Sequence, residues 1–173
     1  MSTPCMPCCL ALTAALFWTV SAAAATLPRS AGIERGRYVV QIAGCNDCHT
    51  AGYAASGGKV PESQWLTGAA LGWRGPWGTT YPSNLRRYMH TVSEAQWLQI
   101  ARSTQYRPPM PWMSLHAMSD VDLRSVYRFV RHLGPAGEAA PTYVPPGARP
   151  QTPFVQFPAE PAGARAEAPA ASR

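Results

Sequence analysis

The pentapeptide at positions 45–49 limits what this chain can become more than any other stretch. It reads Cys45-Asn46-Asp47-Cys48-His49, so two thiols lie three positions apart and a histidine follows the second directly. This order is typical of covalent haem attachment: each thiol joins one vinyl group of the macrocycle, and the imidazole binds the iron. We therefore predict one haem c, held by thioether bonds at Cys45 and Cys48, with His49 as the first axial iron ligand.

The first 25 residues are predicted to be a secretory signal peptide. Residues 9–20 form one apolar run, and small residues at 21–25 offer cleavage positions, although no Lys or Arg precedes the run. The run is shorter than the ~20 residues of a comfortable membrane span. The alternative is an uncleaved membrane anchor. Cys5, Cys8 and Cys9 lie in this segment, so an exported mature chain would keep only the two thiols of the pentapeptide. Because haem c is attached outside the cytoplasmic membrane in bacteria, we expect the protein in the periplasm.

A chain of 173 residues favours one domain. We predict that residues 30–136 form a small all-α domain of the cytochrome c fold, wrapped round the haem, with long loops rich in glycine and aromatic residues. Residues 137–173 are rich in proline and alanine and are predicted to be a tail, partly disordered. Its apolar residues could hold its first half against the domain; these are Val144, Phe154, Val155 and Phe157.

Three stretches have helical patterns. The first, 31–44, ends at the pentapeptide, and its Gly36 would let another helix cross closely. The second, 91–102, follows a pattern in which Ser93 is the N-cap. The third, 119–135, begins at Ser119, has acidic residues in its first turn and ends at a Gly-Pro pair. Its apolar stripe needs a partner, and the first helix is the natural one.

The second axial ligand is predicted to be Met110. Pro109 and Pro111 flank it, and their fixed φ angles keep this backbone out of a helix. A thioether is a soft ligand that suits low-spin haem iron opposite a histidine. Met113 is the nearest rival. The alternative is that Met110 only fills a gap in the core.

The glycine-rich stretch after the pentapeptide carries many donors. We expect its indole and phenol groups to reach the haem propionates. Arginines of the same stretch are charge-assisted candidates for these carboxylates, or else ordinary surface residues. The aromatic residues are Trp65, Trp73, Trp77, Tyr53 and Tyr81, and the arginines are Arg74, Arg86 and Arg87.

The net charge indicates which kinds of partner the protein can bind. The chain carries a formal charge of +6, but no dense basic run with interleaved aromatic residues, so nucleic acid is a poor candidate. A positive balance steers a protein toward acidic redox partners. Membrane contact is expected only through a partner or through a retained signal segment.

The order of these features resembles the bacterial monohaem cytochrome c family, of class I type, over residues 35–134. More narrowly, it is similar to cytochromes associated with periplasmic dehydrogenases, through the stretches 35–40, 75–85, 107–112 and 118–123. The resemblance implies that the first and last helices cross. It also implies that the distal methionine lies about a dozen residues before the Asp122-Leu123 pair, which Met110 satisfies. In this chain Leu85 runs directly into Arg86, where related cytochromes often have a longer acidic loop.

We therefore expect a periplasmic electron-transport protein, not an enzyme, that passes single electrons through one His/Met-ligated haem c. Its redox partners would be a dehydrogenase and a downstream acceptor such as a terminal oxidase or another cytochrome. The alternative is a haem protein with an open sixth site, a small-ligand sensor or peroxidase, with His90 or His116 as a distal base. A structural zinc module is a third class, but Cys45, Cys48 and His49 give three ligands where a closed site needs four.

Overall fold

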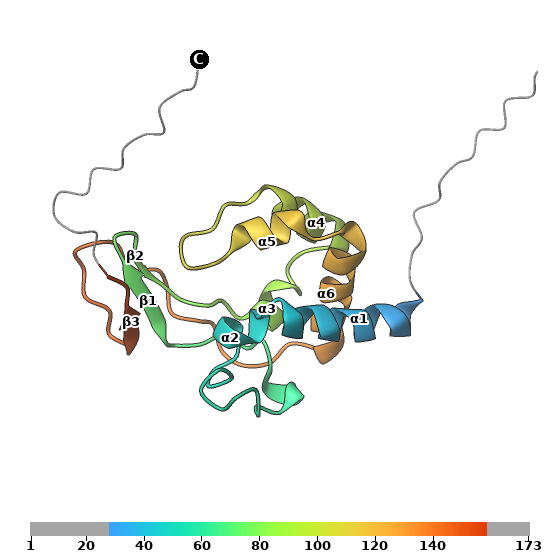
Figure 1. Cartoon of the computed structure of the whole chain (residues 1–173), viewed down its shortest axis with the longest axis horizontal. Helices are drawn as coiled ribbons and strands as arrows, with labels where there is room; N and C mark the ends of the chain where they lie inside the picture. Colours follow the sequence, from blue (N-terminus) through green and yellow to red (C-terminus); the bar gives the residue numbers. More distant parts are fainter. Residues whose placement is uncertain (1–27, 159–173) are drawn as a thin grey trace, which may run out of the picture.

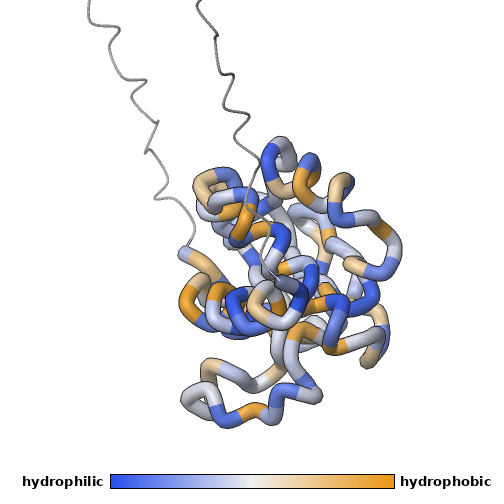
Figure 2. The backbone as a smooth tube through the Cα atoms, turned by 90° about the vertical axis from the view of Figure 1, so that its right-hand side faces the viewer, coloured by the Kyte–Doolittle hydropathy of each residue, from blue (hydrophilic) through white to orange (hydrophobic). Residues whose placement is uncertain are grey.

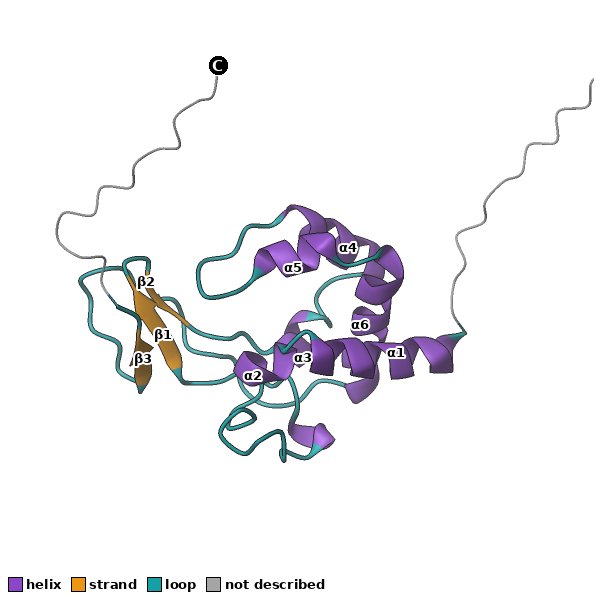
Figure 3. Ribbon diagram, in the orientation of Figure 1, coloured by secondary structure: helices purple, strands orange, loops and turns teal. Residues whose placement is uncertain are grey.

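The computed structural model describes residues 28–158, which contain six α-helices and a three-stranded sheet. The helices gather at one end of the molecule and the sheet lies at the other, with long loops between them (Figure 1, Figure 3). The helices are α1 (Arg29–Ile42), α2 (Cys45–His49), α3 (Leu85–Tyr88), α4 (Glu94–Ser103), α5 (Trp112–Ala117) and α6 (Asp120–Leu133), with a 3-10 turn at Glu62–Gln64. The strands are β1 (Gly72–Gly75), β2 (Gly78–Thr80) and β3 (Phe154–Gln156).

The signal peptide expected at 1–25 lies outside the described residues. Within residues 28–158, no helix has the length and apolar character that crossing a membrane requires.

The sheet shows that the predicted all-α cytochrome c fold is wrong. β1 and β2 form an antiparallel hairpin, and β3 lies parallel to β1, which gives the strand order β2-β1-β3. Glycine and proline dominate the hairpin sequence and favour a loop, but Trp73, Thr79 and Thr80 are good strand formers. Gly75 pairs with Gly78, whose φ of +95° suits glycine in the tight turn. Strands of three or four residues are too short to show an alternating pattern.

The third strand comes from the predicted tail. Phe154 pairs with Gly72 across the parallel ladder, and Val144 forms a bridge with Thr79 of β2. The Phe157 ring lies 5.2 Å from the ring of Trp77 and 6.1 Å from that of Trp73, between centroids. The apolar tail residues therefore do hold residues 144–157 against the domain.

The three predicted helices are confirmed. Ser93 and Gln96 form a capping box at the start of α4, and the Ser119 hydroxyl accepts a hydrogen bond from the Asp122 amide at the start of α6. Figure 2 shows hydrophobic and hydrophilic residues alternating along the helices. Their apolar faces meet in one core, which buries Val39, Val40, Trp97, Leu123, Val126, Phe129 and Val130.

α1 and α6 cross at Gly36, as expected from the sequence. A Cβ built on Gly36 would lie 2.0 Å from the Ser125 carbonyl oxygen and 2.6 Å from the Phe129 Cβ. Both atoms belong to α6. Beside the crossing, Arg35 Nε donates to Asp122 at 2.7 Å. The backbones of the two helices therefore approach each other over a position where no side chain fits.

We predict that Gly36→Ala lowers the free energy of unfolding by about 2–3 kcal/mol, because the helices must separate to admit the methyl group. Gly32→Ala on the same helix is the control. A Cβ on Gly32 meets only the flexible Arg128 side chain, at 3.4 Å, and alanine favours a helix by about 1 kcal/mol over glycine. Chemical denaturation measures both variants. Equal effects would contradict the close crossing.

Candidate haem-attachment site

The pentapeptide forms a single helical turn, α2, directly after α1. Gly44 joins the two helices with a left-handed φ of +67°, which glycine adopts without strain. Cys45 and Cys48 then stand three positions apart on a helix, and Cys45 and His49 four apart, so these side chains share one face. Both thiols are free, not joined in a disulfide. The sulfurs and the imidazole are thus presented together.

The two thiols are held in their protonated form. Burial raises the pKa of Cys45 to about 11 and also raises the pKa of Cys48. Reactive C-x-x-C redox centres instead need a lowered thiol pKa. The pair therefore lacks the electrostatics of a dithiol redox site, whereas addition to a haem vinyl group leaves both sulfurs as neutral thioethers.

His49 is set up as a ligand through one nitrogen. Its side chain is buried, and Nδ1 lies 2.8 Å from the carbonyl oxygen of Ser83. A carbonyl can only accept, so Nδ1 carries the proton and Nε2 keeps its lone pair. Burial lowers the pKa of His49, which keeps the ring neutral. A hydrogen bond from the far nitrogen is the usual way in which proteins orient a metal-binding imidazole.

Two buried polar residues that sequence reasoning missed hold α2 in place. The Thr50 hydroxyl donates to Asn46 Oδ1 at 2.7 Å and accepts the Leu66 amide at 2.8 Å. The Gly68 amide donates to the His49 carbonyl at 2.8 Å. These bonds join α2 to the loop that follows it. Asn46 Nδ2 is buried without a partner in the described part of the chain.

The two candidate methionines differ in environment. Met110 is partly buried and packs against the hydrophobic core, as does Cys45, whereas Met113 is 58% exposed. The non-helical segment that carries Met110 is fastened to the sheet by the Thr80 hydroxyl, which donates to the Pro108 carbonyl at 2.7 Å. These contacts favour Met110 as the residue that can reach an interior site.

Of the three indoles in the glycine-rich stretch, only that of Trp73 is without an acceptor within residues 28–158. Trp65 Nε1 donates to the Val60 carbonyl and Trp77 Nε1 to the Trp73 carbonyl, at 2.8 and 3.3 Å, while Trp73 Nε1 is buried and unpaired. Trp73 pairs with Thr80 in the hairpin, so the two side chains lie on the same face of the sheet. Thr80 is also the residue whose hydroxyl donates to Pro108, in the segment that carries Met110. Trp73 is therefore the one of these three indoles whose N–H could still donate to a bound group.

The three arginines instead bind backbone carbonyls. Arg86 is buried and donates to the carbonyls of Ser63, Leu133 and Gly134, so it satisfies the C-terminal end of α6. Arg87 donates to the Gly137 carbonyl at 3.2 Å and Arg74 to the Ala148 carbonyl at 2.9 Å. Arg86 therefore caps the C-terminal end of α6, and its donors are used by backbone carbonyls rather than left for a propionate.

The two histidines considered as distal bases, His90 and His116, both contact other residues. His90 Nδ1 accepts a hydrogen bond from Arg131, and His116 packs on the Trp112 ring with its Nε2 3.3 Å from the Thr104 carbonyl. Residues 28–158 contain no group of three His, Cys, Asp or Glu side chains arranged to hold a metal ion. No protein-family model, curated protein or solved structure matches the chain.

We predict that Thr50→Val lowers the free energy of unfolding by about 2 kcal/mol, because it leaves the Leu66 amide and Asn46 Oδ1 buried without a partner. Thr50→Ser, which keeps the hydroxyl, should retain most of the stability. Urea denaturation of the full chain distinguishes the two. If both variants lost the same amount, the methyl group and not the hydroxyl would be what holds α2.

Proposed function

We propose that the protein is an exported c-type haem protein that carries single electrons in the periplasm. The observation that carries the proposal is the state of His49. Its imidazole is buried, neutral and fixed through Nδ1 to Ser83, with Nε2 left as a ligand, on the same helical turn as two free thiols. Export and the periplasmic location rest on the sequence of residues 1–25.

Haem c, when bound, supplies an iron that cycles between the ferric and ferrous states. The residues of the chain determine how that centre behaves. Cys45 and Cys48 tether it, and the Ser83 carbonyl makes the His49 imidazole a stronger donor. Met110 would supply a thioether as the second protein ligand, and methionine ligation would raise the reduction potential. His49 is buried and Met110 is partly buried, and low solvent exposure would raise the reduction potential further.

The charge of the chain supports a protein partner. A formal charge of +6 favours encounter with an acidic redox protein. The electron donor is proposed to be a periplasmic dehydrogenase and the acceptor an oxidase or another cytochrome. In this function the chain would convert no substrate of its own, because His49 and Met110 would both hold the iron.

The visible spectrum of the exported protein tests the proposal. The oxidised form should show a methionine-sulfur band toward the red end, and the reduced form should resist CO. Met110→Ala should remove the band, lower the reduction potential and open the reduced protein to CO. Met113→Ala is the matched control and should change none of these properties.

Two results would overturn this assignment. If Met113→Ala removed the sulfur band instead, the distal ligand would be Met113. If the unaltered protein bound CO readily, the sixth site would be open and the protein would not be a simple carrier.

A further inference from the structure

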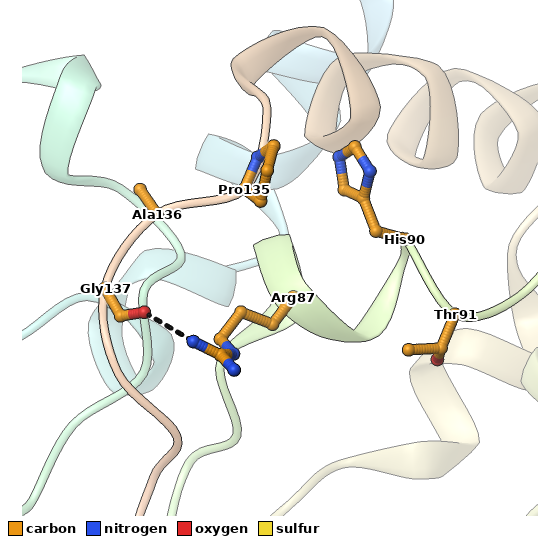
Figure 4. A pocket seen from close by; sticks show the side chains of 6 residues that line it. All are labelled: Arg87, His90, Thr91, Pro135, Ala136 and Gly137. Atoms are coloured by element: carbon orange, nitrogen blue, oxygen red, sulfur yellow. Dashed lines mark hydrogen bonds between the residues drawn. The ribbon is translucent and has the colours of Figure 1, made fainter.

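An open pocket of about 450 Å³ lies between the end of α3 and the chain that leaves α6 (Figure 4). Arg87, His90 and Thr91 come from α3 and the loop after it. Pro135, Ala136 and Gly137 come from the segment after α6. None of these residues belongs to the haem-attachment site, and the proposed function does not use them.

Positive charge collects at this pocket, and no carboxylate of the described residues forms an ion pair with it. Arg87 lines it, Arg131 contacts its His90, and Arg86 is buried nearby among backbone carbonyls. Among residues 28–158, none of these three arginines forms an ion pair, whereas five other arginines do; these are Arg35, Arg37, Arg102, Arg124 and Arg128. Glu138 follows Gly137 directly, yet it is exposed and forms no ion pair within the same range.

His90 adds a neutral donor to the pocket. Arg131 Nη1 lies 2.9 Å from His90 Nδ1, and a guanidinium can only donate, so Nδ1 accepts and Nε2 carries the proton. Partial burial and the charges of Arg131 and Arg86 lower the pKa of His90, consistent with this form. One N–H of the Arg87 guanidinium donates to the Gly137 carbonyl (Figure 4). A guanidinium has five N–H donors, so most of them can still bind a ligand.

We propose that this pocket is an oxyanion-binding site that takes a carboxylate or phosphate group. Arg87 is its principal ligand, because a guanidinium binds such groups through two parallel hydrogen bonds. His90 lines the same pocket, and Arg131, which donates to His90, adds positive charge beside it. The group can belong to a small free anion or to an acidic side chain of a protein. In the second case the partner would contact the segment that begins at Ser83, four residues before Arg87. The carbonyl of Ser83 accepts the hydrogen bond from His49.

Nuclear magnetic resonance of the full chain, as purified after export, tests this site. Phosphate is titrated at constant ionic strength against chloride, and the His90 and Arg87 resonances are followed. Saturable shifts are expected. Arg87→Gln should weaken binding at least about tenfold. The Arg87 amide keeps its bond to Asn84 Oδ1, so the variant should fold, which thermal unfolding checks. Lys59→Gln removes the same charge at an exposed residue outside the pocket and should bind like the unaltered chain.

A parallel titration with a short polyglutamate peptide identifies the source of the oxyanion. Saturation by phosphate supports a free anion, and saturation by the peptide alone supports an acidic side chain of a partner. The site is refuted if neither probe saturates, or if Lys59→Gln loses as much binding as Arg87→Gln. None of these readouts depends on electron transfer, so their failure would leave the proposed function standing.

Discussion

The hydrogen bond from His49 to the Ser83 carbonyl is the interaction on which the arrangement depends. It joins the pentapeptide 45–49 to a segment that lies more than thirty residues away in sequence, and the distance from Nδ1 to the carbonyl oxygen is 2.8 Å. The next residue, Asn84, caps α3 with its Oδ1 and donates through Nδ2 to the carbonyls of Ala136 and Glu138. One short segment therefore orients the imidazole and anchors the chain that leaves α6.

Arg86 extends this connection at an electrostatic cost. It is a buried cation with no carboxylate partner in residues 28–158, and burial lowers its pKa. Carbonyls at the end of α6 compensate, because they carry the negative end of the helix dipole. The same charge contributes to the positive potential around His90. A feature that stabilises the fold thus also adds positive charge at the pocket that His90 lines.

Local signals predicted the helices well and the sheet badly. Ser93 and Ser119 act through bonds to residues three positions away, so short patterns contain all the information needed. Strand β3 exists because Phe154 meets Gly72 about eighty residues earlier, and no local pattern specifies that meeting. The helix crossing was predictable because Gly36 interrupts an otherwise apolar helix face.

The residues of the candidate site also fall into two groups, those predicted from local sequence and those whose roles depend on distant contacts. Cys45, Cys48 and His49 were predicted from their spacing alone, because covalent haem attachment requires that order. Thr50 and Arg86 acquire their roles only from distant acceptors and donors, Leu66 for the first and the end of α6 for the second. Residue type identified Arg86 as a cation but could not say which oxygen atoms it would bind.

The mass of the peptide that contains residues 45–49 tests the central claim most directly. The full chain would be exported in a bacterium that attaches haem c, then denatured and digested. We expect this peptide to carry one haem through Cys45 and Cys48, and the intact chain to stain for haem on a denaturing gel. A Cys45→Ala, Cys48→Ala double variant should lose both signals. An unmodified peptide with two free thiols, recovered from the correctly exported chain, would contradict the account.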